Sequence, residues 1–182
     1  MEHYSSSNKQ LLGWVYGSLG VLIFSLSLPM TRVAVIELNP IFVGLGRAVV
    51  AGILAAILLS ITRQPLPSKR FWLRFAVVAL GIVVGFPLLT AIAMNNAPAS
   101  YGAVIIGLLP LATALYGVWR GKEKVSRSFW VFALLGSGLV VCFALLSETK
   151  SFGKNDLALF GAVIAAGIGY GEGAILARTF GA

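Results

Sequence analysis

Short loops of charged and turn-forming residues separate six apolar segments, which together fill nearly the whole chain. Each segment approaches or exceeds the roughly 20 helical residues that cross the hydrocarbon core of a bilayer. The segments cover residues 11–31, 40–61, 71–94, 99–119, 129–147 and 157–177. They do not alternate polar and apolar residues as barrel strands do. In lipid, backbone N–H and C=O groups must find their hydrogen-bond partners within the protein. The pattern therefore predicts membrane-spanning helices.

Composition supports the same fold class, an all-α integral membrane protein with six transmembrane helices. Of 182 residues, 58% are hydrophobic and 11% are charged, with a mean hydropathy of +0.92. A soluble domain uses about 25% charged residues, so one soluble core is excluded. The single cysteine, Cys142, cannot form a disulfide within the chain, and the single histidine, His3, precedes the first span. Neither a metal site nor a prosthetic cofactor is expected.

Lysine and arginine are unequally divided between the two sides of these spans. One side carries Lys9, Arg63, Lys69, Arg70, Arg74, Arg120, Lys122, Lys124, Arg127 and Arg178. The other side carries Arg32, Lys150 and Lys154. The positive-inside rule then places both termini in the cytoplasm, and the expected location is the plasma (bacterial inner) membrane. Because the net charge of +8 follows from these loops, no nucleic-acid partner is expected.

Prolines and glycines indicate where helices bend or approach closely. Pro29, Pro87 and Pro110 fall inside spans, where each removes a hydrogen bond and makes either a hinge or a static kink. Glycines four residues apart let helices pack closely. Such pairs are Gly13 with Gly17, Gly81 with Gly85, Gly167 with Gly171, and Gly169 with Gly173. Those of the sixth span fall on two stripes roughly 200° apart, which predicts a central or locally flexible helix.

Arg47 and Glu172 are the two charges well inside a span. Such charges usually face a cavity or a partner and are functional candidates. Glu172 could be a proton carrier, a counter-charge for a cationic substrate, or half of a structural pair. The depths of the two residues differ by on the order of 12 Å, and Arg178 lies off the helical face of Glu172. Glu172 is therefore expected to face an inward-opening cavity, and Arg47 either contacts substrate or ties to backbone carbonyls.

Four further polar residues are candidates for contact with a substrate: Asn95, Asn96, Tyr101 and Tyr170. Asn95 and Asn96 could equally form a capped loop at the outer surface. The two tyrosines could equally be packing residues or interface anchors.

The buried glutamate and the glycine pairs are also compatible with two functions in which no solute moves. The stretch "GYGEG" is superficially similar to the Gly-X-Gly-Asp motif of intramembrane aspartyl proteases, but that chemistry needs two aspartates and the chain has one, Asp156. An intramembrane enzyme is thus the least favoured of the possible functions, and no enzymatic activity is expected. A packing or assembly subunit that transports nothing, held by its glycine pairs, is the stronger alternative.

Three segments carry a resemblance to a known family. They are "GWVYGSLGVLIFSLSLPMTR", "NPIFVGLGRAVVAGILAAILL" with its internal Arg47, and "AMNNAPASYGAVIIGLLPLATALYGVWRGKEKVS". In the last segment small residues follow the third span, Pro110 lies in the middle of the fourth, and Glu123-Lys124 precedes Ser126. These features resemble the EamA-type drug/metabolite transporter superfamily.

The resemblance implies ten helices in two inverted five-helix repeats. They would move small polar metabolites, often amino acids or drugs, by alternating access, with efflux favoured. This chain would supply a polar cytoplasmic tail (1–10), the first repeat (11–147) and the start of the second (148–182). It is expected to be a fragment; a complete chain would need a homo- or hetero-oligomeric partner. The other partners expected are the lipid bilayer and a small-molecule substrate.

Overall fold

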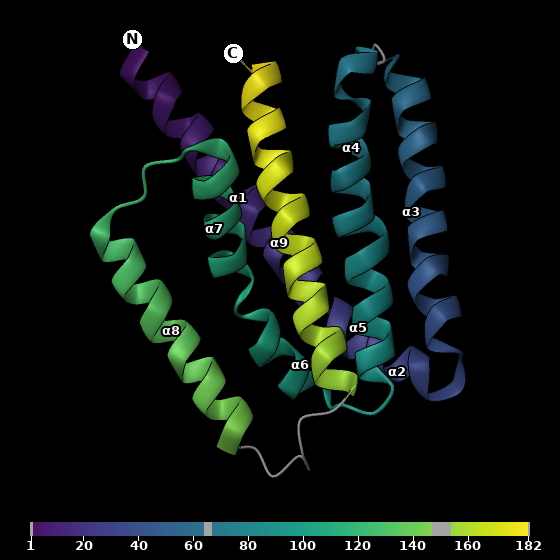
Figure 1. The fold of residues 1–182 in the computed structure, drawn as a ribbon. Coiled ribbons are helices and arrows are strands. Elements are labelled where there is room, and N and C mark those ends of the chain that lie inside the picture. The colour runs from purple at the N-terminus through teal and green to yellow at the C-terminus, as the bar shows by residue number, and fades with distance from the viewer. Residues whose placement is uncertain (1, 64–66, 147–153, 182) are drawn as a thin grey trace.

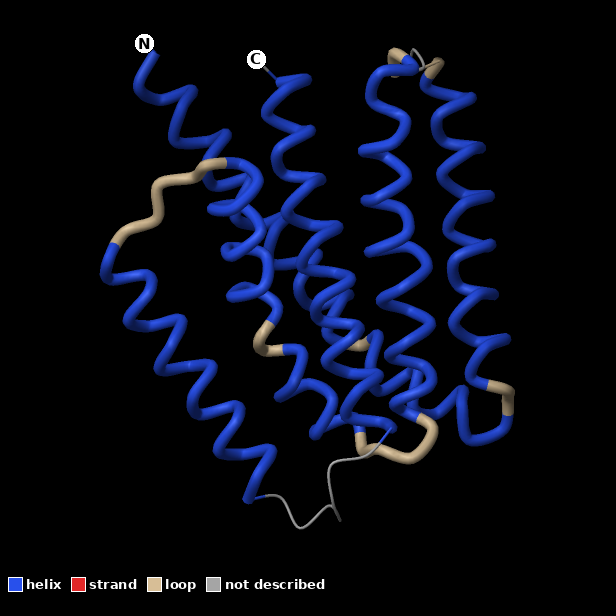
Figure 2. The backbone as a smooth tube through the Cα atoms, in the orientation of Figure 1, coloured by secondary structure: helices blue, strands red, loops and turns tan. Residues whose placement is uncertain are grey.

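The computed structural model describes residues 2–63, 67–146 and 154–181, and these residues form helices joined by short loops (Figure 2). The described part contains no strand, which confirms the all-α prediction. The elements, labelled in Figure 1, are α1 Glu2–Ser25, α2 Ser27–Glu37, α3 Pro40–Thr62, η1 Lys69–Phe71, α4 Trp72–Val78, η2 Ala79–Gly85, α5 Phe86–Met94, α6 Ala99–Ile106, α7 Leu109–Gly121, α8 Arg127–Leu146 and α9 Lys154–Gly181.

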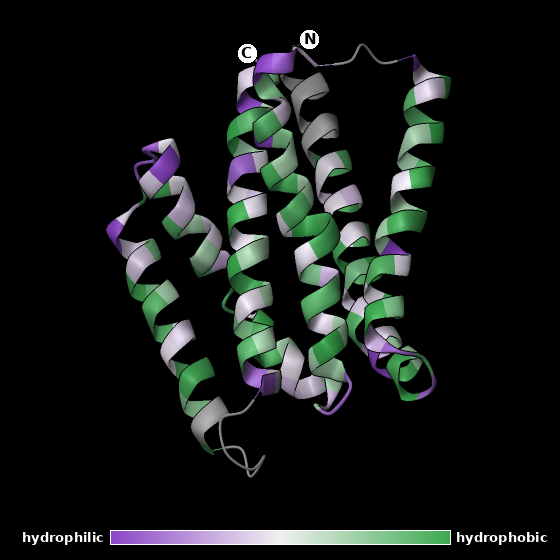
Figure 3. Cartoon of the chain, turned by 45° about the vertical axis from the view of Figure 1, so that its right-hand side comes forward, coloured by the Kyte–Doolittle hydropathy of each residue, from purple (hydrophilic) through white to green (hydrophobic). Residues whose placement is uncertain are grey.

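These elements join end to end into helical segments that match the predicted spans. Five segments are long and apolar enough to cross a membrane: Leu11–Glu37, Pro40–Thr62, Lys69–Met94, Ala99–Gly121 and Asp156–Phe180. The predicted span at 129–147 corresponds to α8, which is apolar over Arg127–Phe143; residue 147 lies outside the described residues. Figure 3 shows hydrophobic residues along the helices and many of the hydrophilic residues near their ends, as expected in a bilayer.

The first span is longer than the prediction of residues 11–31. Helix α2 continues to Glu37, so Arg32 lies within a helix and not in an outer loop. The Arg32 guanidinium donates hydrogen bonds to the carbonyl oxygens of Met94, at 2.5 Å, and Asn95, at 2.6 Å. These carbonyls end α5, where no intrahelical donor reaches them and a cation is favoured. Arg32, which the prediction placed outside the first span, is thus part of its helix and is accommodated by the end of α5.

The third span changes its helical geometry just before Pro87. Element η2, Ala79–Gly85, is a π-helix, and the Phe86 amide donates to the Gly81 carbonyl five residues back. Proline has no amide hydrogen, and its ring crowds the carbonyl four residues earlier. A π-helical turn is one way in which a helix absorbs such a disruption. Pro87 then occupies the first turn of α5, where its missing donor costs little.

The other two intramembrane prolines also follow an interruption. Pro29 lies in the first turn of α2, after the break between α1 and α2 at Leu26. Pro110 lies at the start of α7, after the break at residues 107–108 that separates α6 from α7. The predicted disruptions therefore coincide with helix boundaries.

Helix α9 lies at the centre of the described bundle. It packs against α4, η2, α5, α6 and α7, and runs between α7 and α4 in Figure 1. Half of its most apolar window is buried, against 28% or less in the other spans. Of the two possibilities for the glycine-rich sixth span, a central helix is the one observed.

The two glycine stripes of α9 face different neighbours. A Cβ atom added at Gly167 would lie 2.6 Å from the Ala112 Cβ of α7, and one at Gly169 would lie 2.6 Å from Ile82 of η2. By contrast, a Cβ added at Gly13 or Gly17 of α1 would meet nothing described within 4 Å. Close packing was thus predicted correctly for α9 and wrongly, among the described residues, for α1.

Candidate functional site

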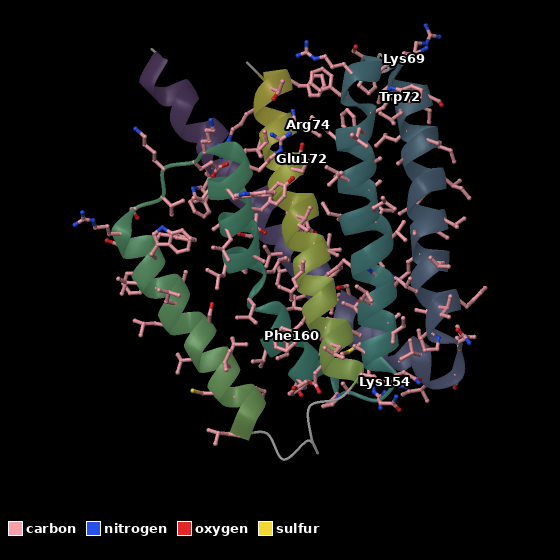
Figure 4. The ribbon with its side chains drawn as sticks, viewed as in Figure 1. Lys69, Trp72, Arg74, Lys154, Phe160 and Glu172 are labelled. Atoms are coloured by element: carbon pink, nitrogen blue, oxygen red, sulfur yellow. The ribbon has the colours of Figure 1, made fainter. Side chains whose placement is uncertain are left out.

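Glu172 of α9 lies where three helices meet, and its side chain is only 2% exposed. One carboxylate oxygen, Oε1, accepts a hydrogen bond from Nε of Arg74 in α4 and forms an ion pair with it. The other oxygen, Oε2, accepts from the Tyr116 hydroxyl of α7 at 2.8 Å. We call Arg74, Tyr116 and Glu172 the carboxylate junction. Figure 4 shows Arg74 beside Glu172, in the half of the molecule that holds Lys69 and away from Lys154.

Glycines beside Glu172 allow the helices to approach. A Cβ added at Gly171 would lie 2.6 Å from the Tyr116 ring, so a larger residue there would push α7 away. On the opposite side of α9, a Cβ added at Gly173 would lie 4.0 Å from Val78 of α4. Small residues at helix contacts permit this close approach in membrane proteins. Gly171 therefore lets α7 come close enough for Tyr116 to reach the carboxylate, whereas position 173 has room for a Cβ atom beside α4.

The junction explains how a carboxylate can be retained inside the bundle. A buried carboxylate is costly unless it is paired and its lone pairs are used, and here both oxygens have donors. Of the three roles left open for Glu172, the described geometry is that of a structural pair. The expectation that Glu172 faces a cavity does not hold for this arrangement, because its side chain points into the junction and is almost fully covered.

A second polar contact ties α9 to α6 at the opposite end of α9. The Tyr101 hydroxyl of α6 donates a hydrogen bond to Oδ1 of Asp156 at 2.6 Å. Asp156 and Glu172 are 16 residues apart, which corresponds to about 24 Å of helix. The bundle therefore holds α9 through polar side chains at two depths, nearly a hydrocarbon-core thickness apart.

A surface ion pair lies beyond the carboxylate junction. Arg178, near the end of α9, contacts Glu123, in the loop after α7, at 2.8 Å between Nη1 and Oε1. Arg178 was expected to be a poor partner for Glu172, and it pairs with a residue of another segment. Because both side chains are partly exposed, this pair contributes little to stability.

Arg47 of α3 lies apart from the junction. Its Nη1 donates a hydrogen bond to the Thr31 hydroxyl of α2 at 2.8 Å. Thr31 is buried and donates in turn to the Ser27 carbonyl at 2.6 Å. Arg47 and Glu172 therefore have separate partners.

Comparison with known proteins identifies the family. The model of the EamA-like transporter family matches residues 11–145. The chain belongs to this family. It is similar to "Uncharacterized transporter YdeK" of Bacillus subtilis (strain 168), with 48% identity over 174 residues, which are 96% of this chain and 61% of the relative.

A second relative of this EamA-like chain is "Uncharacterized transporter sll0355" of Synechocystis sp. (strain ATCC 27184 / PCC 6803 / Kazusa). The two are 32% identical over 118 residues, 62% of this chain and 34% of the relative. The chain thus spans 61% or less of the length of these curated relatives. No solved structure matches the chain significantly.

The remaining candidate residues of this EamA-like chain do not form one site. Asn95 and Asn96 are exposed in the loop that follows α5. Tyr170 is 37% exposed and lines a cavity of about 520 Å³ between α7 and α9, which Pro110 also lines. Tyr101 binds Asp156, as described above. Among the described residues, no group of three or more potential metal ligands occurs.

Two members of the carboxylate junction, Arg74 and Tyr116, were not among the residues predicted for the site. Arg74 was counted with the basic residues between or next to the second and third spans and was not considered as an intramembrane charge, although the predicted span 71–94 contains it, as does the helical segment Lys69–Met94. Tyr116 was not singled out, because a tyrosine near the end of a span is typical of the membrane interface. The depth of Arg74 within its span is the sequence feature that could have indicated a contact with Glu172. Measured from the ends of their spans on the side of Lys69, Arg74 and Glu172 lie equally deep, to within about one helical turn.

Proposed function

We propose that the protein is a transporter that moves small polar metabolites across the plasma (bacterial inner) membrane, with both termini in the cytoplasm. Amino acids, drugs or related solutes are the proposed substrates, alternating access is the mechanism, and efflux is the favoured direction. The observation that carries the proposal is the EamA-like transporter match over residues 11–145. The multi-pass arrangement of apolar helices agrees with it.

The repeat organisation is part of the proposal. Residues 11–147 would form the first five-helix repeat, and residues 148–182 would begin the second, after a cytoplasmic tail at 1–10. Helix α9 runs in the opposite direction to α1 (Figure 1), as the first helix of an inverted repeat should. Its central position among helices of the first repeat would let it transmit movement between the two halves.

We assign the carboxylate junction a role in this cycle. Alternating access requires two arrangements of the same helices, each stabilised by its own contacts. The Arg74–Glu172 ion pair and the Tyr116 hydrogen bond join α4, α7 and α9 in the half of the molecule expected to face the cytoplasm. We propose that they stabilise the arrangement that is closed on that side. Arg47, Asn95, Asn96, Tyr101 and Tyr170 remain candidates for contact with the substrate.

One observation favours the alternative of a packing or assembly subunit. The glycines of α9 fit so closely against α7 and η2 that tight packing alone would explain their presence. Such a subunit would need no substrate, and its buried carboxylate would serve only to fix the helices. The family and the names of the relatives point to a transporter and not to an enzyme, which leaves the intramembrane protease well behind.

Counterflow in proteoliposomes tests the proposal. The full-length protein is reconstituted and challenged with a panel of labelled amino acids and small drugs, beside protein-free liposomes and the Glu172→Gln variant. We expect uptake of a subset of the panel by wild type and its loss in the variant. Glu123→Gln is the matched control, because it removes a carboxylate whose pair with Arg178 is partly exposed. If wild type never exceeds protein-free liposomes, the packing subunit is the better account.

A further inference from the structure

The guanidinium of Arg47 has more hydrogen-bond donors than partners. It offers five N–H groups, and the Thr31 hydroxyl is its one described hydrogen-bond partner. Arg47 lies seven residues after Pro40, the first residue of α3, which places its backbone about 10 Å along the helix. At this depth water is scarce, and an arginine usually faces a cavity or an acceptor group.

The described residues supply no counter-charge. Glu172 pairs with Arg74, Glu123 pairs with Arg178, and no carboxylate among the described residues lies within ion-pair distance of Arg47. Thr31 cannot compensate, because a hydroxyl carries no charge and its own hydrogen is used by the Ser27 carbonyl. Among the described residues, the positive charge and most of the donors of Arg47 are therefore unmatched.

The position of the guanidinium argues against a lipid phosphate as the partner. The hydrogen bond to Thr31 directs Nη1 toward the contact between α2 and α3, and Thr31 itself is 3% exposed. An arginine that reaches for the headgroups would extend along α3 toward the membrane surface. The Arg47 side chain is otherwise exposed in the described part of the chain, so its unmatched donors are open to an acceptor from outside α2 and α3.

We propose that Arg47, oriented by Thr31, binds the carboxylate of the transported solute. This inference rests on the proposed transport function and narrows its substrates to carboxylate-bearing compounds, such as amino acids and other small organic acids. A guanidinium donates two parallel hydrogen bonds to a carboxylate, and this geometry discriminates against an amide. The Thr31 hydroxyl of α2 accepts a hydrogen bond from Nη1 and so fixes the orientation of the guanidinium.

Accessibility of position 47 is the first test, and it does not depend on transport. In the full-length protein, Cys142 and any cysteine outside this chain are replaced, and Arg47→Cys is treated in membranes with a hydrophilic methanethiosulfonate reagent. Val49→Cys is the matched control, since it lies at nearly the same depth on the opposite side of α3, is 60% exposed, and is expected to face lipid. We expect labelling at position 47 and none at 49. A position 47 that stays unlabelled would overturn the proposal, because Arg47 would then be a structural tie to another part of the protein.

Substrate chemistry is the second test. Thermal stabilisation of the purified full-length protein is measured with pairs of compounds that differ only in carrying a carboxylate or a carboxamide. We expect at least one acid to raise the Tm of wild type while its amide does not. In Arg47→Gln the acid should bind roughly 10- to 100-fold more weakly, with no such loss for the amide, and Arg47→Lys should retain part of the preference.

The outcomes of the two proposals are distinguishable. Equal binding of acid and amide by wild type, or an unchanged acid preference in Arg47→Gln, contradicts the carboxylate site even if transport is observed. Acid binding that depends on Arg47, without movement of any compound in proteoliposomes, would retain the site and contradict the transport function.

Discussion

At the residue scale, the molecule is defined by how it pairs its intramembrane charges. Glu172 uses both oxygens, one toward Arg74 and one toward Tyr116, and is nearly fully buried. Arg32 uses the carbonyls that end α5. Arg47 has only a neutral partner among the described residues, and so is the residue that most needs an acceptor from elsewhere.

Replacing Arg74 alone should destabilise the protein more than replacing Arg74 and Glu172 together. Arg74→Met leaves the Glu172 carboxylate buried without its cation, and we expect a loss of about 3 to 5 kcal/mol in the free energy of unfolding. In the double variant Arg74→Met with Glu172→Met no charge remains, so most of that stability should return. Denaturation of the detergent-purified protein, followed by circular dichroism, measures both. A double variant that loses as much stability as Arg74→Met, or more, would show that the residues do not act as a pair.

At the element scale, α9 organises the bundle through its small residues. Its two glycine stripes meet α7 and η2, and the interrupted third and fourth spans pack against it. In α1, by contrast, Gly13 and Gly17 have no described neighbour close to the position of a Cβ atom. The same four-residue spacing therefore has different meanings in the two helices.

Glycine substitutions should separate these two cases. Gly167→Ala places a methyl group 2.6 Å from the Ala112 Cβ and should destabilise the bundle by about 1 to 3 kcal/mol through overpacking. Gly17→Ala adds the same methyl group where nothing described lies within 4 Å, so it should be neutral or slightly stabilising through better helix propensity. Thermal unfolding of the two variants side by side gives the comparison. Equal effects would mean that α9 is not as closely packed as described.

The sequence predicted the spans and the central helix well, because hydropathy and glycine spacing are local signals. It did not predict which charges meet. Arg74 and Glu172 are 98 residues apart, and nothing local to either reveals the other. Arg32 was expected to end a span because an isolated arginine is costly in lipid, and the acceptors that remove this cost belong to α5. Partner choice depends on tertiary packing.

At the scale of the whole molecule, topology follows from the distribution of basic residues. The side that carries most lysine and arginine is expected to be cytoplasmic. The loop of Asn95 and Asn96 then lies outside, and the loop of Lys122 lies inside. Both loops are exposed, so both can be labelled.

Impermeant labelling of intact cells tests this orientation. In a background without other cysteines, Asn96→Cys should react with a membrane-impermeant maleimide, whereas Lys122→Cys should react only after the membrane is permeabilised. Both positions lie in loops next to helix ends, so reactivity should depend on the side of the membrane and not on burial. The reverse pattern would place the termini outside.

The most direct test of the central claim, that Arg74 and Glu172 act as a pair in a transport cycle, is a double-mutant cycle on counterflow rate. Wild type, Arg74→Gln, Glu172→Gln and the double variant of the full-length protein are reconstituted at equal folded amounts, with the solute that wild type moves best. We predict that each single variant slows counterflow at least tenfold, and that the double variant is no slower than the worse single variant, because one shared contact has been removed. Losses that multiply in the double variant, or single variants that transport at the wild-type rate, would contradict the claim.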